Sequence, residues 1–375
     1  MFFNKKNSVT EAQVLEKLRE VNDPDLNRDI VTLGFVKDLK IKGGDVSFKV
    51  ELTTPACPVK EQLKSECDTK VRSISGVTSV EIEMTSNVRS HQPGPSASVP
   101  GSTKVSLPNI KNMIAVASGK GGVGKSTVAV NLALALAKEG AKVGLLDADI
   151  YGPSIPIMMG VKRRPDVHGE HVHPIEKDGI KLISMGFLVP ENQAVVWRGP
   201  MVHGALTQFL TQVQWGELDY LIIDMPPGTG DAQLTMSQTA PLSGAIIVTT
   251  PQEVSLLDAR RGLLMFQNVK VPVLGVVENM SGFVCSHCDE VTPIFRTGGG
   301  KKIADEFQVP FLGGIPIDPL VAEGGDLGKP IVLAQPDSEV AKRFISLAGQ
   351  VASKLSTLQF QSTASFKPVG LSWQT

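Results

Sequence analysis

The sequence predicts a doubly wound α/β domain with a mainly parallel sheet, preceded by a small α+β domain. Apolar and polar residues alternate in the first part of the chain, whereas near-continuous apolar runs separated by helical segments begin near residue 111. Such runs indicate a parallel sheet that is covered on both faces. At 375 residues the chain also exceeds the roughly 250–300 residues at which single cores divide. The predicted parts are the small domain 8–86, a linker 87–110, the large domain 111–356 and an unassigned tail 357–375.

Periodicity predicts the elements of the small domain. The segment "TEAQVLEKLREV" places Val14, Leu18 and Val21 at helical spacing, and Thr10 precedes it as a candidate N-cap. The stretch "VKDLKIKGGDVSFKVEL" alternates on both sides of "GGD", which is typical of a β-hairpin. A second helix over about residues 59–74 and a strand in "GVTSVEIEMT" complete the domain. The following linker is rich in serine, proline and glycine and has no periodicity.

Apolar runs predict the strands of the large domain, and helical segments alternate with them. The runs are "MIAVAS", "KVGLLDAD", "YLIIDMPP", "GAIIVTTP", "VLGVVENM" and "FLGGIPID". The segment "SEVAKRFISLAGQVASKL" spaces Val340, Phe344, Val351 and Leu355 along one face, which predicts a closing helix packed on the sheet.

The composition argues against several partners and compartments. Lysine plus arginine number 37 against 38 acidic residues, so a net charge of −1 predicts no partnership with nucleic acid or an acidic membrane. The start "MFFNKKNSVTEAQ" lacks the apolar core of a secretory signal, and no run approaches the roughly 20 apolar residues that span a bilayer. We therefore expect a cytoplasmic protein whose four cysteines are free thiols, metal ligands or redox groups.

A phosphate-binding loop is the strongest signal in the chain. The strand "MIAVAS" runs into "GKGGVGKST", which fits the pattern G-x-x-x-x-G-K-[ST], and a helix follows. In this pattern backbone N–H groups converge on phosphate oxygens, Lys125 reaches the β- and γ-phosphates, and Ser126 can bind Mg²⁺. The candidate ATP-binding residues of the loop are Gly119, Lys120, Gly121, Gly122, Val123, Gly124, Lys125, Ser126 and Thr127.

Aspartates follow two of the predicted strands. "LLDADIYGPS" places Asp147 and Asp149 at the carboxyl end of one strand, and "LIIDMPPGTGD" places Asp224 at the end of another. A strand-end acid in this position holds Mg²⁺ through water in related nucleotide sites. Aspartates at strand ends are also ordinary helix caps, so it is their order after the phosphate loop that supports a magnesium site.

The loop "KGGVGK" resembles the deviant phosphate loop of the nitrogenase iron protein, MinD and ParA class of ATPases. The resemblance implies that Lys120 reaches the nucleotide of a partner subunit, so it predicts a homodimer. It also implies that Asp149 orients the attacking water, that Asp147 lies near the magnesium, and that Asn279 in "VVENMS" reads the adenine base. The alternatives are an exposed loop lysine for Lys120 and a turn residue for Asn279.

Cysteines mark two further places. Cys57 in "LTTPACPVKEQL" lies between two prolines before a predicted helix, where the helix dipole is expected to lower the pKa of its thiol. The segment resembles the cysteine loop of the MIP18-like domain of iron–sulfur assembly proteins, although an inert buried cysteine is the alternative. Cys67 is expected to serve packing. Cys285 and Cys288 form a C-x-x-C pair in "SGFVCSHCDE".

Several long motifs together resemble the Mrp/Nbp35 family of iron–sulfur cluster carriers over nearly the whole chain. They are "GKGGVGKST", "LLDADIYGPSIP", "IDMPPGTGD", "VVENMSGFVCSHC" and "IPIDPLVAEGGDLGKPI". The resemblance implies an ATPase that forms a homodimer, receives a labile [4Fe–4S] cluster from a scaffold protein and passes it to apoproteins. The N-terminal four-cysteine motif of the eukaryotic cytosolic members is absent from the sequence, so a bacterial or organellar type is implied.

Two cysteines cannot complete a four-ligand site by themselves. In a two-fold dimer, Cys285 and Cys288 of both copies would supply four thiolates around one cluster. A zinc site would use the same soft thiolate ligands and remains an alternative. A dithiol redox pair normally lies at a helix N-terminus, and the sequence predicts none here. His287, between the cysteines, is expected to be an ordinary surface residue.

Two other functions compete with the carrier. A positioning ATPase of the ParA or MinD kind would need a basic amphipathic helix for membrane or basic clusters for DNA. The tail has one lysine, and "VKRRPDVHGEHVH" mixes its basic residues with acids and histidines. A metabolic enzyme with a phosphate loop would leave the C-x-x-C pair unexplained.

Overall fold

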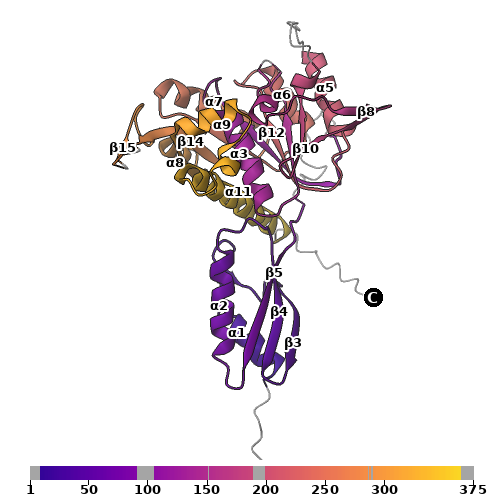
Figure 1. Cartoon of the computed structure of the whole chain (residues 1–375), viewed down its shortest axis with the longest axis vertical. Helices are drawn as coiled ribbons and strands as arrows, with labels where there is room; N and C mark the ends of the chain where they lie inside the picture. Colours follow the sequence, from indigo (N-terminus) through magenta and orange to yellow (C-terminus); the bar gives the residue numbers. More distant parts are fainter. Residues whose placement is uncertain are drawn as a thin grey trace, which may run out of the picture. The chain divides into compact units, whose positions relative to one another are not determined.

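The computed structural model describes residues 9–90, 105–150, 152–188, 199–285, 287–288 and 290–364. It divides into two compact units (Figure 1). One unit is built from described residues of 1–89 and 352–375, and the other from those of 90–351. The larger unit is an α/β fold with a mainly parallel sheet and the smaller one is α+β, so the predicted fold class is confirmed.

The small unit packs two helices against a three-stranded sheet in the order β3-β4-β5. Thr10 caps the first helix through a capping box, because its Oγ1 accepts from the Gln13 N–H and the Gln13 Oε1 accepts from the Thr10 N–H. The predicted hairpin is confirmed as β3 and β4, and β5 pairs with β4 in parallel. The elements are α1 (Glu11–Leu18), β1 (Asn22–Asp23), β2 (Arg28–Asp29), β3 (Val36–Lys42), β4 (Asp45–Leu52), α2 (Lys60–Arg72) and β5 (Ser79–Ser86).

The large unit is built around a sheet in the order β10-β11-β7-β12-β6-β13-β14-β15, with β16 also paired to β14. All six predicted strands are present. The strands are β6 (Ile110–Ala117), β7 (Val143–Asp147), β10 (Ile175–Lys177), β11 (Ile180–Ser184), β12 (Leu218–Asp224), β13 (Gly244–Thr249), β14 (Val273–Val284), β15 (Val291–Thr292) and β16 (Phe311–Ile317). The hairpin β8 (Asp166–His168) and β9 (His171–His173) lies outside this sheet.

Helices cover both faces of the central sheet. Consecutive residues of β6 from Met113 to Ala117 are fully buried, and because side chains alternate across a sheet, neither face there is open to water. The helices are α3 (Lys125–Lys138), α4 (Ile155–Met158), α5 (Gly199–Thr211), α6 (Asp231–Thr239), α7 (Glu253–Asn268), α8 (Gly299–Glu306), α9 (Pro319–Asp326), α10 (Ile331–Ala334) and α11 (Glu339–Ala364), with a 3₁₀ turn η2 (Met185–Phe187).

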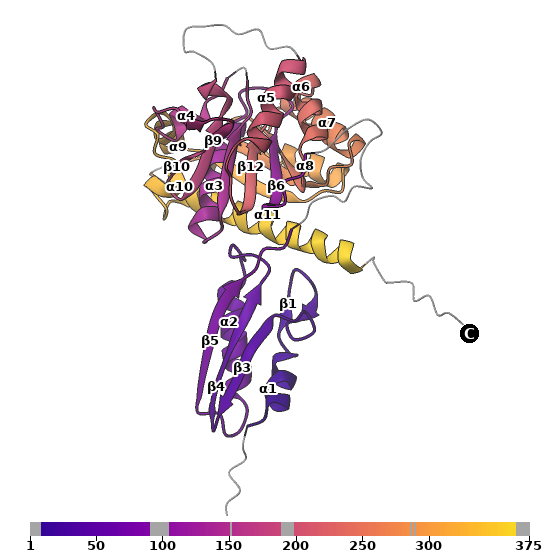
Figure 2. The ribbon, with the colours of Figure 1, turned by 90° about the vertical axis from the view of Figure 1, so that its right-hand side faces the viewer.

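Two regions differ from the prediction. Residues 166–184 form four strands that sequence periodicity missed, because each has only three to five residues. The closing helix does not stop at residue 356 but continues to Ala364 as one unbroken helix (Figure 2). The polar residues Ser356 and Thr357 fit this helix because each hydroxyl donates to a carbonyl one turn earlier. Neither α11 nor any other helix of the described residues has the length and apolar content to cross a bilayer.

One buried side chain in α6 has no hydrogen-bond partner. Gln233 is 1% exposed, and neither its Nε2 nor its Oε1 is paired within the part of the chain that the structure describes. A desolvated amide without a partner costs folding free energy, which an apolar side chain of similar length would not.

We therefore expect Gln233→Met to raise the free energy of unfolding of the large unit by about 1–3 kcal/mol. Urea denaturation followed by tryptophan fluorescence measures it. Asn131→Leu is the matched control: Asn131 is also buried, but it donates to the Thr127 carbonyl and accepts from the Val332 N–H, so its replacement should lower stability. A loss of stability in both variants would contradict the prediction.

Candidate functional site

The predicted phosphate loop joins the end of β6 at Ala117 to the start of α3 at Lys125. Gly119 has no room for a side chain, since a Cβ there would lie 2.2 Å from the Asp258 backbone of α7. Gly124 is in the left-handed conformation, with φ 83°, and turns the chain into α3. The loop therefore ends at a helix N-terminus, the geometry that binds phosphate in proteins.

Lys125 lies at the centre of a buried polar cluster. Its Nζ is 2.7 Å from Asp224 Oδ1 and 3.4 Å from Asp149 Oδ2. Ser126 Oγ donates to the other carboxylate oxygen of Asp224 at 2.6 Å. Lys125 is 6% exposed and Asp224 is fully buried. The structure thus brings together four of the residues that the sequence predicted for one site.

The parallel register places the acids side by side. Asp224 at the end of β12 pairs with Asp147 at the end of β7, which pairs in turn with Ser184 at the end of β11. Asp147 Oδ2 accepts from Ser184 Oγ at 2.8 Å, and its Oδ1 accepts from the Asp149 N–H. Sequence reasoning missed Ser184, although the run "IKLIS" ends in a polar residue as β7 and β12 do.

Burial shifts the charge balance of these acids. It raises the pKa of Asp147 to about 8, the negative charge of Asp224 adds to the shift, and the hydrogen bond from Ser184 opposes it. Burial also raises the pKa of Asp224, with Lys125 opposing. Both shifts indicate that one lysine does not balance the carboxylates gathered here.

The donor set fits a magnesium ion. Mg²⁺ prefers oxygen ligands, and Ser126 Oγ and the Asp224 carboxylate lie within hydrogen-bond distance of each other. A divalent cation beside them would supply the positive charge that the raised carboxyl pKa values indicate is lacking.

Asn279 lies against the phosphate loop. It is 8% exposed, and its Nδ2 donates to the Val123 carbonyl at 2.9 Å. A Cβ at Gly124 would lie 2.1 Å from the same Nδ2, so the second glycine of the motif makes room for this contact. Lys120 is half-buried, and its carbonyl accepts from Ser118 Oγ. Gly121 and Gly122 are exposed at the tip of the loop.

The cysteine pair lies in the loop between β14 and β15. These strands pair antiparallel through Val284 and Val291, and the Cys285 N–H donates to the Glu290 carbonyl at 3.0 Å. Cys285 is half-buried and Cys288 is exposed. Among the described residues, no three His, Cys, Asp or Glu side chains are placed to hold a metal ion together. The two thiols are thus accessible on one loop.

The expected lowering of the Cys57 pKa is wrong. Burial raises the pKa of this thiol to about 11, outweighing the Val59 N–H, which lowers it, and the charges of Asp23 and Asp25 add to the increase. Helix α2 begins only at Lys60, and Cys57 packs on the core of the small unit. Cys67 is fully buried within α2, which confirms its packing role.

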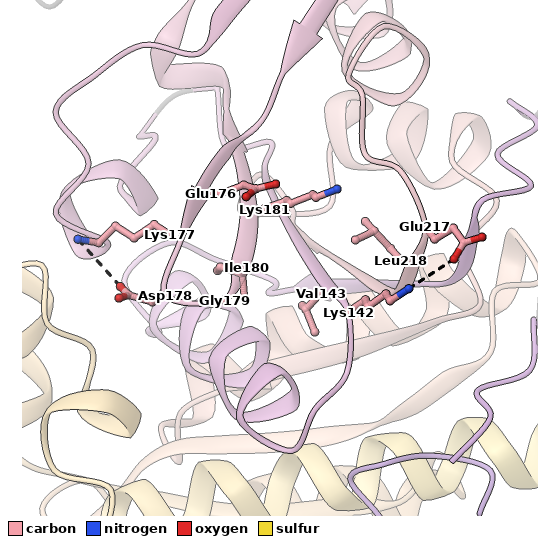
Figure 3. A pocket seen from close by; sticks show the side chains of 10 residues that line it. All are labelled: Lys142, Val143, Glu176, Lys177, Asp178, Gly179, Ile180, Lys181, Glu217 and Leu218. Atoms are coloured by element: carbon pink, nitrogen blue, oxygen red, sulfur yellow. Dashed lines mark hydrogen bonds and ion pairs between the residues drawn. The ribbon is translucent and has the colours of Figure 1, made fainter. Parts of the chain in front are cut away.

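A separate cavity of about 580 Å³ opens at the other end of the strands (Figure 3). It lies where β7, β11 and β12 begin, whereas the phosphate loop follows the end of β6. It shares no residue with the site described above. The charged residues around it balance in sign: Lys142, Lys177, Lys181, Glu176, Asp178 and Glu217.

Comparison with known proteins covers both units. The family model of NUBPL iron-transfer P-loop NTPases matches residues 109–352, and a model of iron–sulfur cluster assembly proteins matches residues 11–83. An iron–sulfur cluster carrier protein of Synechocystis sp. is 51% identical over 354 residues, which cover 93% of this chain and 98% of the relative. A protein of the same name from Escherichia coli is 44% identical over 355 residues, 92% of each chain.

A solved structure resembles the large unit. A nucleotide-binding protein from Archaeoglobus fulgidus, in complex with ADP, is 42% identical with a TM-score of 0.55. The match covers 62% of this chain and 92% of the other.

The raised pKa of Cys57 predicts slow alkylation. A thiol of pKa about 11 holds roughly one thiolate in a thousand at pH 8, whereas free cysteine holds about a quarter. The thiolate is the nucleophile, so we expect iodoacetamide to modify Cys57 far more slowly than free cysteine, with the rate rising about tenfold per pH unit up to pH 10. Mass spectrometry of the Cys57 peptide measures the rate, with exposed Cys288 as the internal reference. Labelling of Cys57 at the rate of free cysteine would contradict the assignment.

Proposed function

The chain belongs to the family of iron–sulfur cluster carriers built on a P-loop NTPase, and from this membership we propose that it hydrolyses ATP and transfers a labile [4Fe–4S] cluster to apoproteins. The cluster is cargo that the chain receives from a scaffold protein. A homodimer is the proposed working form. One copy supplies only two of the four thiolates of a [4Fe–4S] cluster, and Lys120 is proposed to contact the nucleotide of the other copy.

The observation that carries the proposal is the path of strand β14. Asn279, within this strand, holds the Val123 carbonyl of the phosphate loop, and the strand leads directly into the loop that bears Cys285 and Cys288. Nucleotide and cysteine sites are therefore connected by one stretch of backbone. This connection suits a carrier whose affinity for a cluster changes when ATP binds.

The nucleotide chemistry is assigned to the buried cluster. Loop residues 119–127 would cradle the phosphates, and Lys125 would exchange its contact with Asp224 for the β- and γ-phosphate oxygens. Mg²⁺ held by Ser126 and, through water, by Asp224 would neutralise charge on the phosphates. Asp149 would orient the water whose oxygen attacks the γ-phosphorus as the bond to the β–γ bridging oxygen breaks and ADP leaves.

Three further residues receive proposed roles. Asp147 would hold Asp149 in place, because its Oδ1 accepts from the Asp149 N–H at 3.1 Å. Lys120 would reach the nucleotide of the partner copy, and Asn279 would contact the adenine base after it enters the site. The roles of Lys120 and Asn279 come from the resemblance to the MinD and ParA class, which also implies that Asp147 lies near the magnesium. The role given to Asp147 here rests on its contact with Asp149.

Cysteine geometry supports a bridged cluster. Cys285 and Cys288 lie on an accessible loop with no third ligand gathered around them among the described residues. Two copies would supply four thiolates, the set that holds a [4Fe–4S] cluster. Cys57 would serve delivery rather than stable binding, since it is a lone, half-buried thiol in the other unit.

Replacing the two loop lysines should separate binding from hydrolysis. Lys125→Ala should abolish ATP binding, because it removes the group that faces the phosphates. Lys120→Ala should bind ATP but lose hydrolysis by about 10³-fold or more, the value of a cation supplied across an interface in other nucleotidases. Asp149→Ala should likewise bind ATP without hydrolysing it. Calorimetry with ATP and a phosphate-release assay measure the two properties.

Lys138→Ala is the matched control, since this exposed lysine ends the same helix that Lys125 begins. It should leave both properties unchanged. Normal hydrolysis by Lys120→Ala would refute the contact of Lys120 with the nucleotide of the partner copy. Loss of ATP binding by Asp149→Ala would indicate that Asp149 has a structural role.

Cysteine replacement tests the bridged site. After anaerobic reconstitution the chain should hold about four irons per two copies, with the brown absorption of a [4Fe–4S] cluster. Cys285→Ala and Cys288→Ala should each abolish that absorption and leave ATP binding intact. Iron analysis, visible spectroscopy and size-exclusion chromatography measure the outcome.

Cys57→Ala serves as the control for cluster content, which it should leave unchanged while slowing transfer to an acceptor apoprotein. A full cluster on a monomeric protein would refute the bridging arrangement. Tightly bound zinc without iron would refute the cluster itself and favour the zinc site.

A further inference from the structure

The hairpin β8–β9 gathers three of the six histidines of the chain within six residues. Asp166 pairs with His173 and His168 pairs with His171 across the two strands. Directly paired residues share a face, and residues two apart along a strand do as well. Three imidazoles and one carboxylate therefore lie on a single face of the hairpin.

The spacing of two of these rings matches one shared metal ion. The centroids of His168 and His173 are 5.3 Å apart, with an angle of 65° between the ring planes. An imidazole bound through nitrogen has its centroid about 3.2 Å from the metal, so two of them on a tetrahedral ion have centroids about 5.2 Å apart. His171 and Asp166 flank this pair, each directly opposite one of its members.

The hairpin is anchored at the strand that carries His171 and His173. The Val172 N–H donates to the Gln212 carbonyl, and the Val172 carbonyl accepts from the Gln214 N–H. On the face opposite the histidines, Val172 packs against the core of the large unit. His171 and His173 are therefore held by an anchored strand, and β8, which bears Asp166 and His168, is paired to it.

Gln214 also touches the third histidine. Its Nε2 lies 2.9 Å from His171 Nδ1. If the amide turns by 180°, its oxygen accepts from Nδ1–H and leaves the Nε2 lone pair free, which is the usual arrangement behind a metal-bound histidine. Asp166 lies 3.8 Å from Arg163 in an exposed ion pair that it would exchange for the metal.

We propose that this hairpin binds a late divalent transition-metal ion such as Zn²⁺, with His168 and His173 as its central ligands and His171 and Asp166 completing the site. As the side chains stand, no three such groups of the described residues converge on one point. The proposal requires these exposed side chains to rotate so that their ligand atoms converge on the ion. Imidazole and carboxylate ligands select zinc, copper or nickel over Mg²⁺. The site is separate from the cysteine pair and does not rest on the function proposed above.

The test is calorimetric titration of the full chain with Zn²⁺ alone, in a Cys285→Ser, Cys288→Ser background that removes the competing thiolates. Excess Mg²⁺ in the buffer occupies oxygen-only sites. We expect one Zn²⁺ per chain. Loss of a hydrogen-bond partner behind a metal ligand typically costs about 10–100-fold in affinity, so His168→Ala and His173→Ala should each weaken binding at least tenfold.

Val167→Ala is the matched control, because Val167 is 59% exposed on the opposite face of the same hairpin. It should bind Zn²⁺ with unchanged affinity, and all variants should unfold at the same temperature in chelator. Absence of Zn²⁺ binding with the histidines intact, or binding that the double variant His168→Ala, His173→Ala leaves unaltered, would overturn the proposal.

Discussion

The ion pair between Lys125 and Asp224 is the interaction that holds the candidate site of the large unit together. A fully buried carboxylate is costly unless an opposite charge and hydrogen bonds satisfy it, and Lys125 and Ser126 offset part of that cost. The pair requires the end of β12 to lie beside the start of α3. The parallel pairing of β7, β12 and β6 meets this requirement, and the same register aligns Ser184, Asp147 and Asp224 in a row.

Much of this arrangement could be predicted from the sequence. Sequence length and spacing predict the phosphate loop and the apolar strands β6, β7 and β12. They also predict the aspartates at the ends of β7 and β12. Ser184 was missed because β11 is short and its second residue, Lys181, interrupts the apolar pattern. Its place beside Asp147 arises from pairing between strands far apart in the chain, which periodicity within a segment does not encode.

Local patterns also failed where burial decides the chemistry. The position of Cys57 before a helix suggested a lowered pKa, but desolvation in the core of the small unit outweighs the helix. The end of α11 was missed for a related reason, since Ser356, Thr357 and Gln359 are polar, yet their side chains are paired or buried in the folded helix. Exposure is a property of the whole fold, so the sequence of one segment does not report it.

Strand β14 contains one residue whose backbone has a wider consequence. Met280, directly after Asn279, is in the left-handed conformation with φ 57°, and the register with β16 shifts between Asn279 and Phe283. A non-glycine residue held in this conformation typically costs about 1–3 kcal/mol, which the surrounding structure must supply. The strand is thus irregular at Met280, between its contact with the phosphate loop and its cysteine loop. Under the proposed function, a change at Asn279 would reach Cys285 and Cys288 through this irregular stretch of strand rather than through regular pairing with β16.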